Sequence, residues 1–178
     1  MEKLINYINY IENLICKTYN AYPLKSIFFI TTIIILIFLS KKISKISYSY
    51  ALLTLPATIM HELSHLTLSV ITLGKPVKIN LIPKKTKNGI IYGYVESSNI
   101  NIWNAALIGL APLILLILGV IFLFKYLIPE KNIFFIILDF YIVLMFIEGG
   151  IPSKEDLKIA IKSWPLLFIG IILSFIKF

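Results

Sequence analysis

The sequence predicts an all-α polytopic membrane protein with about five transmembrane helices and a small β hairpin between the second and the third. Hydrophobic residues make up 58% of the 178 residues, and the mean hydropathy is +0.89. Uncharged stretches that fill much of a bilayer recur along the chain. They cover residues 26–40, 46–74, 97–124, 132–147 and 163–176, interrupted by Glu62 in the second and Asp139 in the fourth. Flanking lysines extend the shorter stretches by reaching the membrane interface.

The first segment, residues 1–22, is expected to form an amphipathic helix. Apolar side chains recur there at helical spacing, with lysines and asparagines on the opposite face: Leu4, Ile8, Ile11 and Ile15. Polar residues interrupt any apolar core, so the segment does not read as a signal peptide. Two alternatives stay open for this helix: it lies on the membrane surface, or it packs against the helical bundle.

Residues 75–100 carry the pattern of an extramembrane β hairpin. Alternation over residues 77–82 and a β-rich run over residues 90–95 flank a lysine-rich turn with Asn88-Gly89 near its tip. An edge strand beside an active site pairs with an extended substrate by strand addition. The alternative is a hairpin without a binding role.

The net charge of +8 comes from seventeen lysines and no arginine against nine acidic residues. In a membrane protein, lysines set orientation and contact anionic headgroups, so the charge does not indicate a nucleic-acid partner. Eleven lysines fall on one side when the N-terminus, the hairpin and residues 149–162 share it, against six on the other. This split predicts a multi-pass protein of the cell membrane with a cytoplasmic N-terminus. Cys16 is alone, so no intrachain disulfide exists.

Both histidines of the chain lie in the run His61-Glu62-Leu63-Ser64-His65. Residues four apart share one face of a helix, so the two imidazoles can bind one metal ion with Glu62 beside them as a base. A carboxylate near the middle of a membrane helix costs about 2.5–3.5 kcal/mol, and a bound metal compensates it. Small polar residues extend the histidine face into a stripe that indicates water access: Thr54, Thr58, Ser69 and Thr72.

The third metal ligand must be a carboxylate, because the chain has no third histidine. A catalytic zinc takes three protein ligands and leaves one position open for water. Asp139 is a candidate because an intramembrane carboxylate is functional by default. Asp156 would also form a capping box with Ser153 at the start of a helix, which is a structural role. The full set of candidates is Glu96, Asp139, Glu148, Glu155 and Asp156.

The order of these motifs resembles the site-2 protease family of intramembrane zinc metalloproteases. Residues 61–65 match its HExxH element, and Gly109-Leu110-Ala111-Pro112 is similar to its Gly/Pro-containing second element. Residues 151–156, with an aspartate four residues after a proline, are similar to its third element. The resemblance covers roughly residues 50–160 and includes the hairpin. Ser64 and Leu157 stand where the family usually has glycine.

This resemblance implies a zinc-dependent intramembrane protease that hydrolyses peptide bonds of membrane-spanning substrates. One Zn²⁺ per chain would be held by His61, His65 and Asp156, with Glu62 as the catalytic base. Residues 23–178 would form a single membrane-embedded metalloprotease-like domain with a catalytic core at about 48–160. The expected partners are a transmembrane protein or peptide substrate and the lipid bilayer.

Two other functions remain as alternatives. The histidines could serve a non-proteolytic membrane metal-binding or transport protein, or a non-catalytic chaperone or immunity-like membrane protein that keeps the motif for structure. Glu62 favours the enzyme over both, because a pure ligand pair does not require a base between its members.

Overall fold

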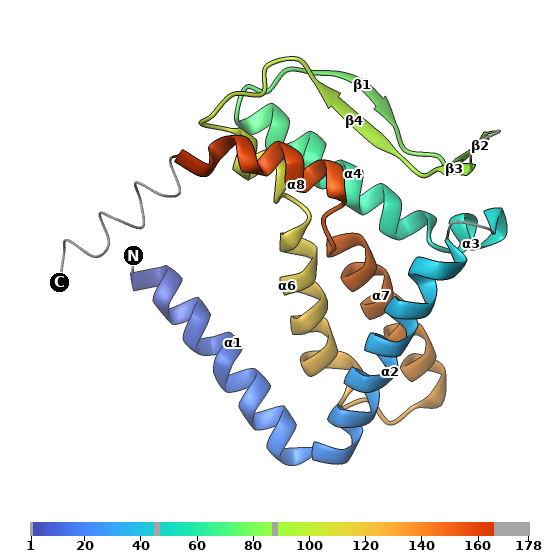
Figure 1. The fold of residues 1–178 in the computed structure, drawn as a ribbon. Coiled ribbons are helices and arrows are strands. Elements are labelled where there is room, and N and C mark those ends of the chain that lie inside the picture. The colour runs from blue at the N-terminus through green and yellow to red at the C-terminus, as the bar shows by residue number, and fades with distance from the viewer. Residues whose placement is uncertain (1, 45–46, 87–88, 166–178) are drawn as a thin grey trace.

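The structure is a computed structural model that describes residues 2–44, 47–86 and 89–165. It is mostly helical (Figure 1). The helices are α1 (Glu2–Ala21), α2 (Pro23–Ile43), α3 (Tyr48–Leu53), α4 (Leu55–Ile71), α5 (Ala105–Gly109), α6 (Leu113–Phe122), α7 (Ile133–Gly150) and α8 (Lys154–Ala160). A π-helical turn, η1 (Leu123–Leu127), continues α6, and a 3₁₀ turn, η2 (Ile161–Ser163), follows α8.

Helices α2, α6 and α7 pack together as a bundle. Its core contains Phe29 and Ile33 of α2, Leu127 of η1 and Val143 of α7. The outward faces carry exposed apolar side chains, among them Phe38 at 72% and Phe134 at 67% exposure. By length and composition, α2 and α7 could each cross a membrane, whereas the apolar helix over Leu113–Leu127 is shorter. These two helices correspond to the first and fourth predicted spans.

The second and third apolar stretches are each divided into two helices. A proline has no amide hydrogen and fits only the first turn of a helix, so it marks where a new helix begins. Pro56 lies in the first turn of α4, and Thr54 separates this helix from α3. Pro112 caps α6 after the short α5. The fifth predicted span, residues 163–176, falls almost wholly outside the described residues.

The predicted hairpin is present between the second and third apolar stretches. Strands β1 (Pro76–Asn80) and β4 (Tyr94–Ser97) pair antiparallel, and β2 (Lys84–Thr86) and β3 (Gly89–Ile91) continue the ribbon toward its tip. Gly89 has φ +130°, a backbone conformation that favours glycine. Asn88, the other residue of the predicted turn, lies outside the described residues.

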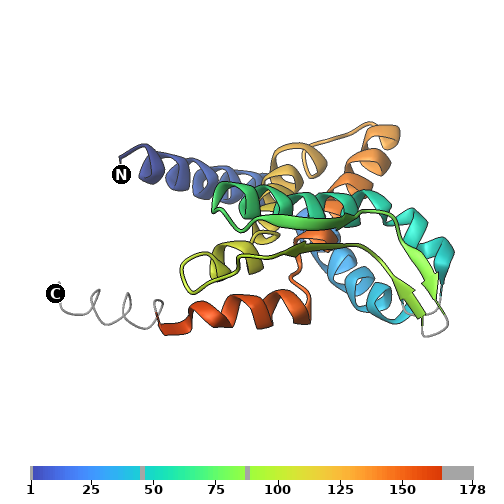
Figure 2. The same cartoon turned by 90° about the horizontal axis from the view of Figure 1, so that it is seen from above.

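Helices α4 and α8 lie across the ends of α2, α6 and α7, and the hairpin covers α4 (Figures 1 and 2). We call α4, α5, α8 and strands β1–β4 the upper layer. Its hairpin reaches back over α4 to the segment that follows α2. There Tyr92 Oη donates to Ser44 O at 2.8 Å, and Tyr48 Oη donates to Pro83 O at 3.1 Å. The tip of the hairpin and the end of α2 are therefore neighbours.

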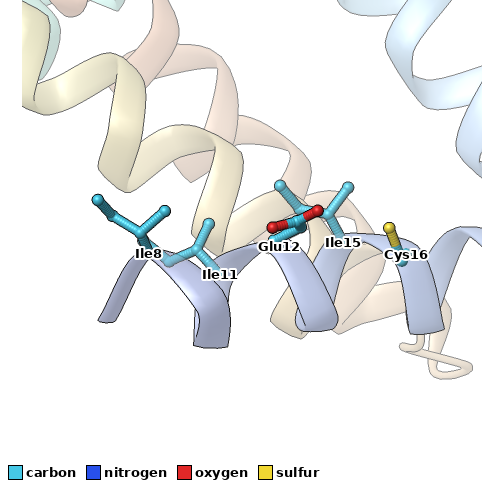
Figure 3. Close-up of a pocket in the computed structure, with 5 residues that line it drawn as sticks. All are labelled: Ile8, Ile11, Glu12, Ile15 and Cys16. Carbon is cyan, nitrogen blue, oxygen red and sulfur yellow. The ribbon is translucent and has the colours of Figure 1, made fainter. Parts of the chain in front are cut away.

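Helix α1 packs against the bundle along part of its length. Leu14 and Ile15 pack against the bundle core. Leu4 and Ile8, nearer the N-terminus, are 65% and 55% exposed. A hollow runs beside the helix, lined by Ile8, Ile11, Glu12, Ile15 and Cys16 (Figure 3). One half of the apolar stripe is therefore packed on the bundle, and the other half is open.

Candidate metal centre

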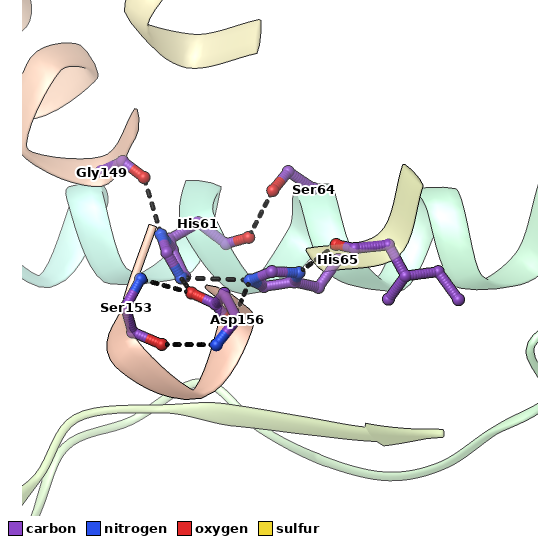
Figure 4. A network of polar contacts seen from close by, with 7 residues as sticks. His61, Ser64, His65, Gly149, Ser153 and Asp156 are labelled. Carbon is purple, nitrogen blue, oxygen red and sulfur yellow. Dashed lines mark hydrogen bonds and ion pairs between the residues drawn. The ribbon is translucent and has the colours of Figure 1, made fainter. Parts of the chain in front are cut away.

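The two histidines project from one face of α4, as their spacing predicts. Their ring centroids lie 4.8 Å apart, and their Nε2 atoms are 3.2 Å apart (Figure 4). His65 is buried and His61 is partly buried. Four residues along an α-helix bring a side chain back to nearly the same direction, so α4 alone fixes this pairing.

Two backbone carbonyls orient the imidazole rings. His61 Nδ1 lies 2.7 Å from Gly149 O, and His65 Nδ1 lies 2.8 Å from Ile108 O. A carbonyl oxygen only accepts hydrogen bonds, so each Nδ1 carries the hydrogen. This leaves the Nε2 atom of each ring facing the other ring and available as a metal ligand. A metal-ligating histidine has this arrangement, with the other ring nitrogen held by a hydrogen bond.

Asp156 reaches the histidines from the first turn of α8. Its Oδ2 lies 3.2 Å from His61 Nε2, and its Oδ1 lies 3.1 Å from His65 Nε2. Ser153 forms the predicted capping box: its Oγ accepts from Asp156 N at 3.1 Å, and its N–H donates to Asp156 Oδ2 at 2.6 Å. The carboxylate of Asp156 therefore caps the start of α8 and also contacts both histidines.

The Asp156 carboxylate is ionised in this position. Burial works against its charge, but the surrounding polar groups of His61, His65 and Ser153 hold the pKa of Asp156 well below its usual range. An ionised carboxylate beside two imidazoles is a suitable ligand set for a divalent cation.

The three side chains fit a tetrahedral metal ion. Their ligand atoms lie within 4.8 Å of one another, and the closest pairs are 3.1–3.2 Å apart. A tetrahedron whose corners are 2.0–2.1 Å from a zinc ion has edges of about 3.3 Å. This spacing of the three ligand atoms suits a cation between them. His61, His65 and Asp156 could therefore hold a metal ion.

A cavity of about 720 Å³ opens beside this centre. Its walls come from α4, from β4, from the start of α8 and from the end of α2. Glu62 lines the cavity, is buried at 7% exposure, and accepts no hydrogen bond from the described residues. Gly93 packs directly over it, because a Cβ at residue 93 would lie 2.8 Å from Glu62 Cγ. The Glu62 carboxylate is thus free to bind a water molecule in the cavity.

Two of the other candidate ligands form ion pairs at the surface. Glu96 Oε2 lies 2.9 Å from Lys78 Nζ across the β1–β4 pair. Glu155 Oε1 lies 2.6 Å from Lys158 Nζ on α8. Both carboxylates are more than half exposed, so neither joins the histidines.

The remaining two candidates lie on α7 and are not grouped with the histidine nitrogens, although Glu148 lines the same cavity. Glu148 accepts hydrogen bonds from Tyr50 Oη at 2.9 and 3.1 Å. Asp139 precedes Gly150 by eleven residues (150 − 139), which is about 16 Å along a helix axis. Asp156 alone of the five candidate carboxylates is grouped with both histidines in the described part of the chain.

Close helix packing supports the centre, and the sequence analysis did not anticipate it. A Cβ on Gly149 would lie 2.8 Å from Ala57 O, so this glycine lets α7 touch α4 beside His61. A Cβ on Gly109 would lie 2.7 Å from Ala160 N, so α5 packs equally closely on α8. In the sequence, the Gly149-Gly150 pair could have indicated that another helix approaches closely at this point. The backbone carbonyls that orient the histidines leave no signal in the sequence, because every residue has a backbone carbonyl.

Comparison of the chain with protein-family models, curated proteins and solved structures found no match. The geometry groups two histidines and one carboxylate that could hold a metal ion, and a second carboxylate, Glu62, lines the cavity beside them. Three protein ligands with an open position are the arrangement of catalytic zinc sites, whereas structural zinc sites are closed by four.

Proposed function

We propose that this chain is a multi-pass membrane zinc protease that hydrolyses peptide bonds of membrane-spanning substrates. The observation that carries the proposal is the convergence of His61, His65 and Asp156 beside the unpaired Glu62 in one cavity. The motif order that resembles site-2 proteases supports it independently of the geometry. The apolar helices α2 and α7 support placement in a membrane.

The residues of the cavity have separate chemical roles in this proposal. His61, His65 and Asp156 would hold a zinc ion, which would supply a bound water of lowered pKa and a Lewis acid for the peptide carbonyl. Glu62 accepts the proton of the attacking water and returns it to the leaving amine. The carbonyls of Gly149 and Ile108 keep the imidazoles aligned while this occurs.

Strand β4 supplies a binding edge for an extended substrate. One edge of β4 is paired with β1, and Tyr94, Val95 and Ser97 of β4 line the cavity. A peptide that adds to the other edge has its backbone hydrogen bonds satisfied by the strand and its carbonyls presented to the cavity. Gly93 admits the hairpin close to Glu62, which keeps this edge near the base.

The decisive experiment replaces the base and leaves the ligands intact. Glu62→Gln keeps the size of the side chain, so the variant is expected to fold and retain about one zinc per chain. Cleavage of single-span peptides in liposomes should fall about a hundredfold to ten-thousandfold. Glu2→Gln is the matched control, because Glu2 is exposed in the first turn of α1 and lies outside the cavity. This control should cleave like the wild type.

Two outcomes would contradict the proposal. Equal cleavage by wild type and Glu62→Gln would remove the assigned base. Zinc-dependent ion flux that is unaffected by Glu62→Gln would instead support the metal-transport alternative, in which the histidines bind the transported ion.

A further inference from the structure

The upper layer lies outside the apolar bundle, and this position determines what the metal centre can reach. Helix α4, which carries both histidines, runs across the ends of α2, α6 and α7 and does not lie alongside them (Figures 1 and 2). Exposed apolar side chains occur on the bundle, such as Phe38 and Phe134, and also on α4, such as Ile71, so apolar exposure alone does not separate the two parts. The open hairpin and the charged side chains do.

The hairpin is not suited to a lipid-exposed position in hydrocarbon. A two-stranded ribbon has two open edges, and each unsatisfied backbone group is strongly unfavourable in a bilayer core. Strands β1 and β4 pair only with each other among the described residues. The upper layer, which includes this ribbon, therefore belongs in water or among lipid headgroups.

Charged side chains at the cavity wall agree with this position. Lys41 at the end of α2 and Lys154 and Glu155 at the start of α8 line the cavity and are exposed. Headgroups and water solvate such charges, whereas hydrocarbon does not.

Lysines also gather at this end of the molecule. Those described in or next to the upper layer are Lys41, Lys42, Lys75, Lys78, Lys84, Lys85, Lys154, Lys158 and Lys162. The opposite end of the bundle has Lys17, Lys25, Lys125 and Lys131, and a hydrogen bond from Lys25 Nζ to Glu130 O joins two of its segments. A dense group of lysines beside a membrane attracts anionic headgroups.

We infer that the metal centre lies at the membrane–water interface on the lysine-rich side and cleaves an extended segment just outside the transmembrane helix of its substrate. This inference rests on the proposed function and names its substrate class. A segment outside the bilayer has no helical hydrogen bonds to break in hydrocarbon, so it can add to β4 directly. Helices α2, α6 with η1, and α7 then anchor the layer in the membrane.

This arrangement differs from the five-span topology in one measurable way. Five spans place residues 41–45 and the hairpin at opposite ends of the second span, and therefore on opposite sides of the bilayer. In the structure, the hydrogen bond between Tyr92 and Ser44 joins the same two regions. A bilayer core is about 30 Å thick, so both descriptions cannot hold.

Cysteine labelling with a membrane-impermeant maleimide tests the placement without any activity assay. Lys42→Cys, Lys85→Cys and Lys131→Cys are made in a Cys16→Ser background and labelled in sealed vesicles, with detergent-opened vesicles as the control for reactivity. All three native positions are exposed. We expect positions 42 and 85 to label from one side and position 131 from the other. If positions 42 and 131 label from the same side and position 85 labels from the opposite side, the inference is overturned.

Two matched substrates test the substrate class. One single-span peptide carries a fixed cleavable sequence immediately outside its helix, at the end flanked by the lysine-rich side. The other carries the same sequence at the centre of the helix. The first should be cleaved at least about tenfold faster, because the second must expose backbone groups to hydrocarbon. Preference for the central site would overturn the inference.

The labelling experiment and the cleavage experiment together distinguish a failure of this inference from a failure of the proposed function. If zinc-loaded protein cleaves neither peptide while the labelling follows the expected pattern, the proposed function and the substrate class both fall, and only the interfacial placement stands. If cleavage depends on Glu62 but the central site is preferred, the proposed function stands and the substrate class is wrong.

Discussion

The two halves of the metal centre are built by different means. His61 and His65 lie on one helix of 17 residues, and the helical repeat alone brings them together. Asp156 lies at the start of a helix of seven residues and reaches the histidines through contacts between distant parts of the chain. The histidine pair is a local property of the sequence, whereas the position of the carboxylate is a property of the fold. Replacing either histidine should therefore abolish metal binding. Replacing a residue that supports the carboxylate should only lower the metal affinity.

The largest effect is expected from removing the ligands themselves. His61→Ala and His65→Ala should each lower zinc affinity by more than about a hundredfold, since loss of a supporting residue alone costs about 10–100-fold. Asp156→Ala should also weaken binding, and Asp139→Ala, the matched control, should not. Elemental analysis and competition with a chelator measure how much zinc affinity each variant loses. A stronger loss in Asp139→Ala than in Asp156→Ala would show that the third ligand is wrongly assigned.

A smaller effect is expected from Gly149→Ala, which disturbs the packing behind His61. The added Cβ would lie 2.8 Å from Ala57 O and force α7 away from α4, at a cost of about 1–3 kcal/mol. Because Gly149 O orients His61, zinc affinity should fall about tenfold as well.

Gly119→Ala is the matched control for this change. Its Cβ would crowd Ile147 Cγ1 at 2.9 Å in the bundle, away from the centre. It should lower the thermal stability without changing zinc affinity. If both variants lose zinc to the same extent, the orienting role of Gly149 is wrong.

The smallest effect is expected from Ser153→Ala, which removes one hydrogen bond of the capping box. Loss of an N-cap costs about 1 kcal/mol, and here it should also loosen the turn that positions Asp156. Asn132→Ala removes the side-chain cap of α7 at the opposite end of the molecule. Thermal unfolding should register both changes, and chelator competition should register only Ser153→Ala. An unchanged zinc affinity in Ser153→Ala would mean that the packing of α8, and not its cap, positions the carboxylate.

The features that sequence reasoning predicted are those with local causes. The histidine pair, the apolar helices α2 and α7, and the hairpin all follow from the spacing of neighbouring residues. The breaks at Pro56 and Pro112 also have a local cause, the missing amide hydrogen, and were open to prediction. The direction of α4 across the bundle could not be predicted in this way. An apolar stretch looks alike whether its helix crosses a membrane or lies over the ends of other helices.

The third candidate ligand, Asp156, shows the same limit of prediction from the sequence. The sequence offered five carboxylates, and no periodicity distinguishes the one that meets the histidines. The choice depends on Gly149 touching Ala57, on Gly109 touching α8, and on Ser163 Oγ, which accepts from Ala106 N at 2.9 Å and donates to Ile102 O at 2.7 Å. Each of these contacts joins residues more than fifty positions apart or two separate helices, so none can be read from a short window.

In the proposed zinc enzyme, the double role of Asp156 would link the supply of metal to the lifetime of the protein. Its carboxylate closes the capping box of α8 and also faces His61 and His65, so the first turn of α8 and the centre share one side chain. A ligand that binds only the folded form stabilises that form by mass action. In a cell depleted of zinc, this turn would open more often, and quality-control proteases that recognise opened segments would remove the chain sooner. Abundance, and not only turnover of substrate, would then report how much zinc the cell holds.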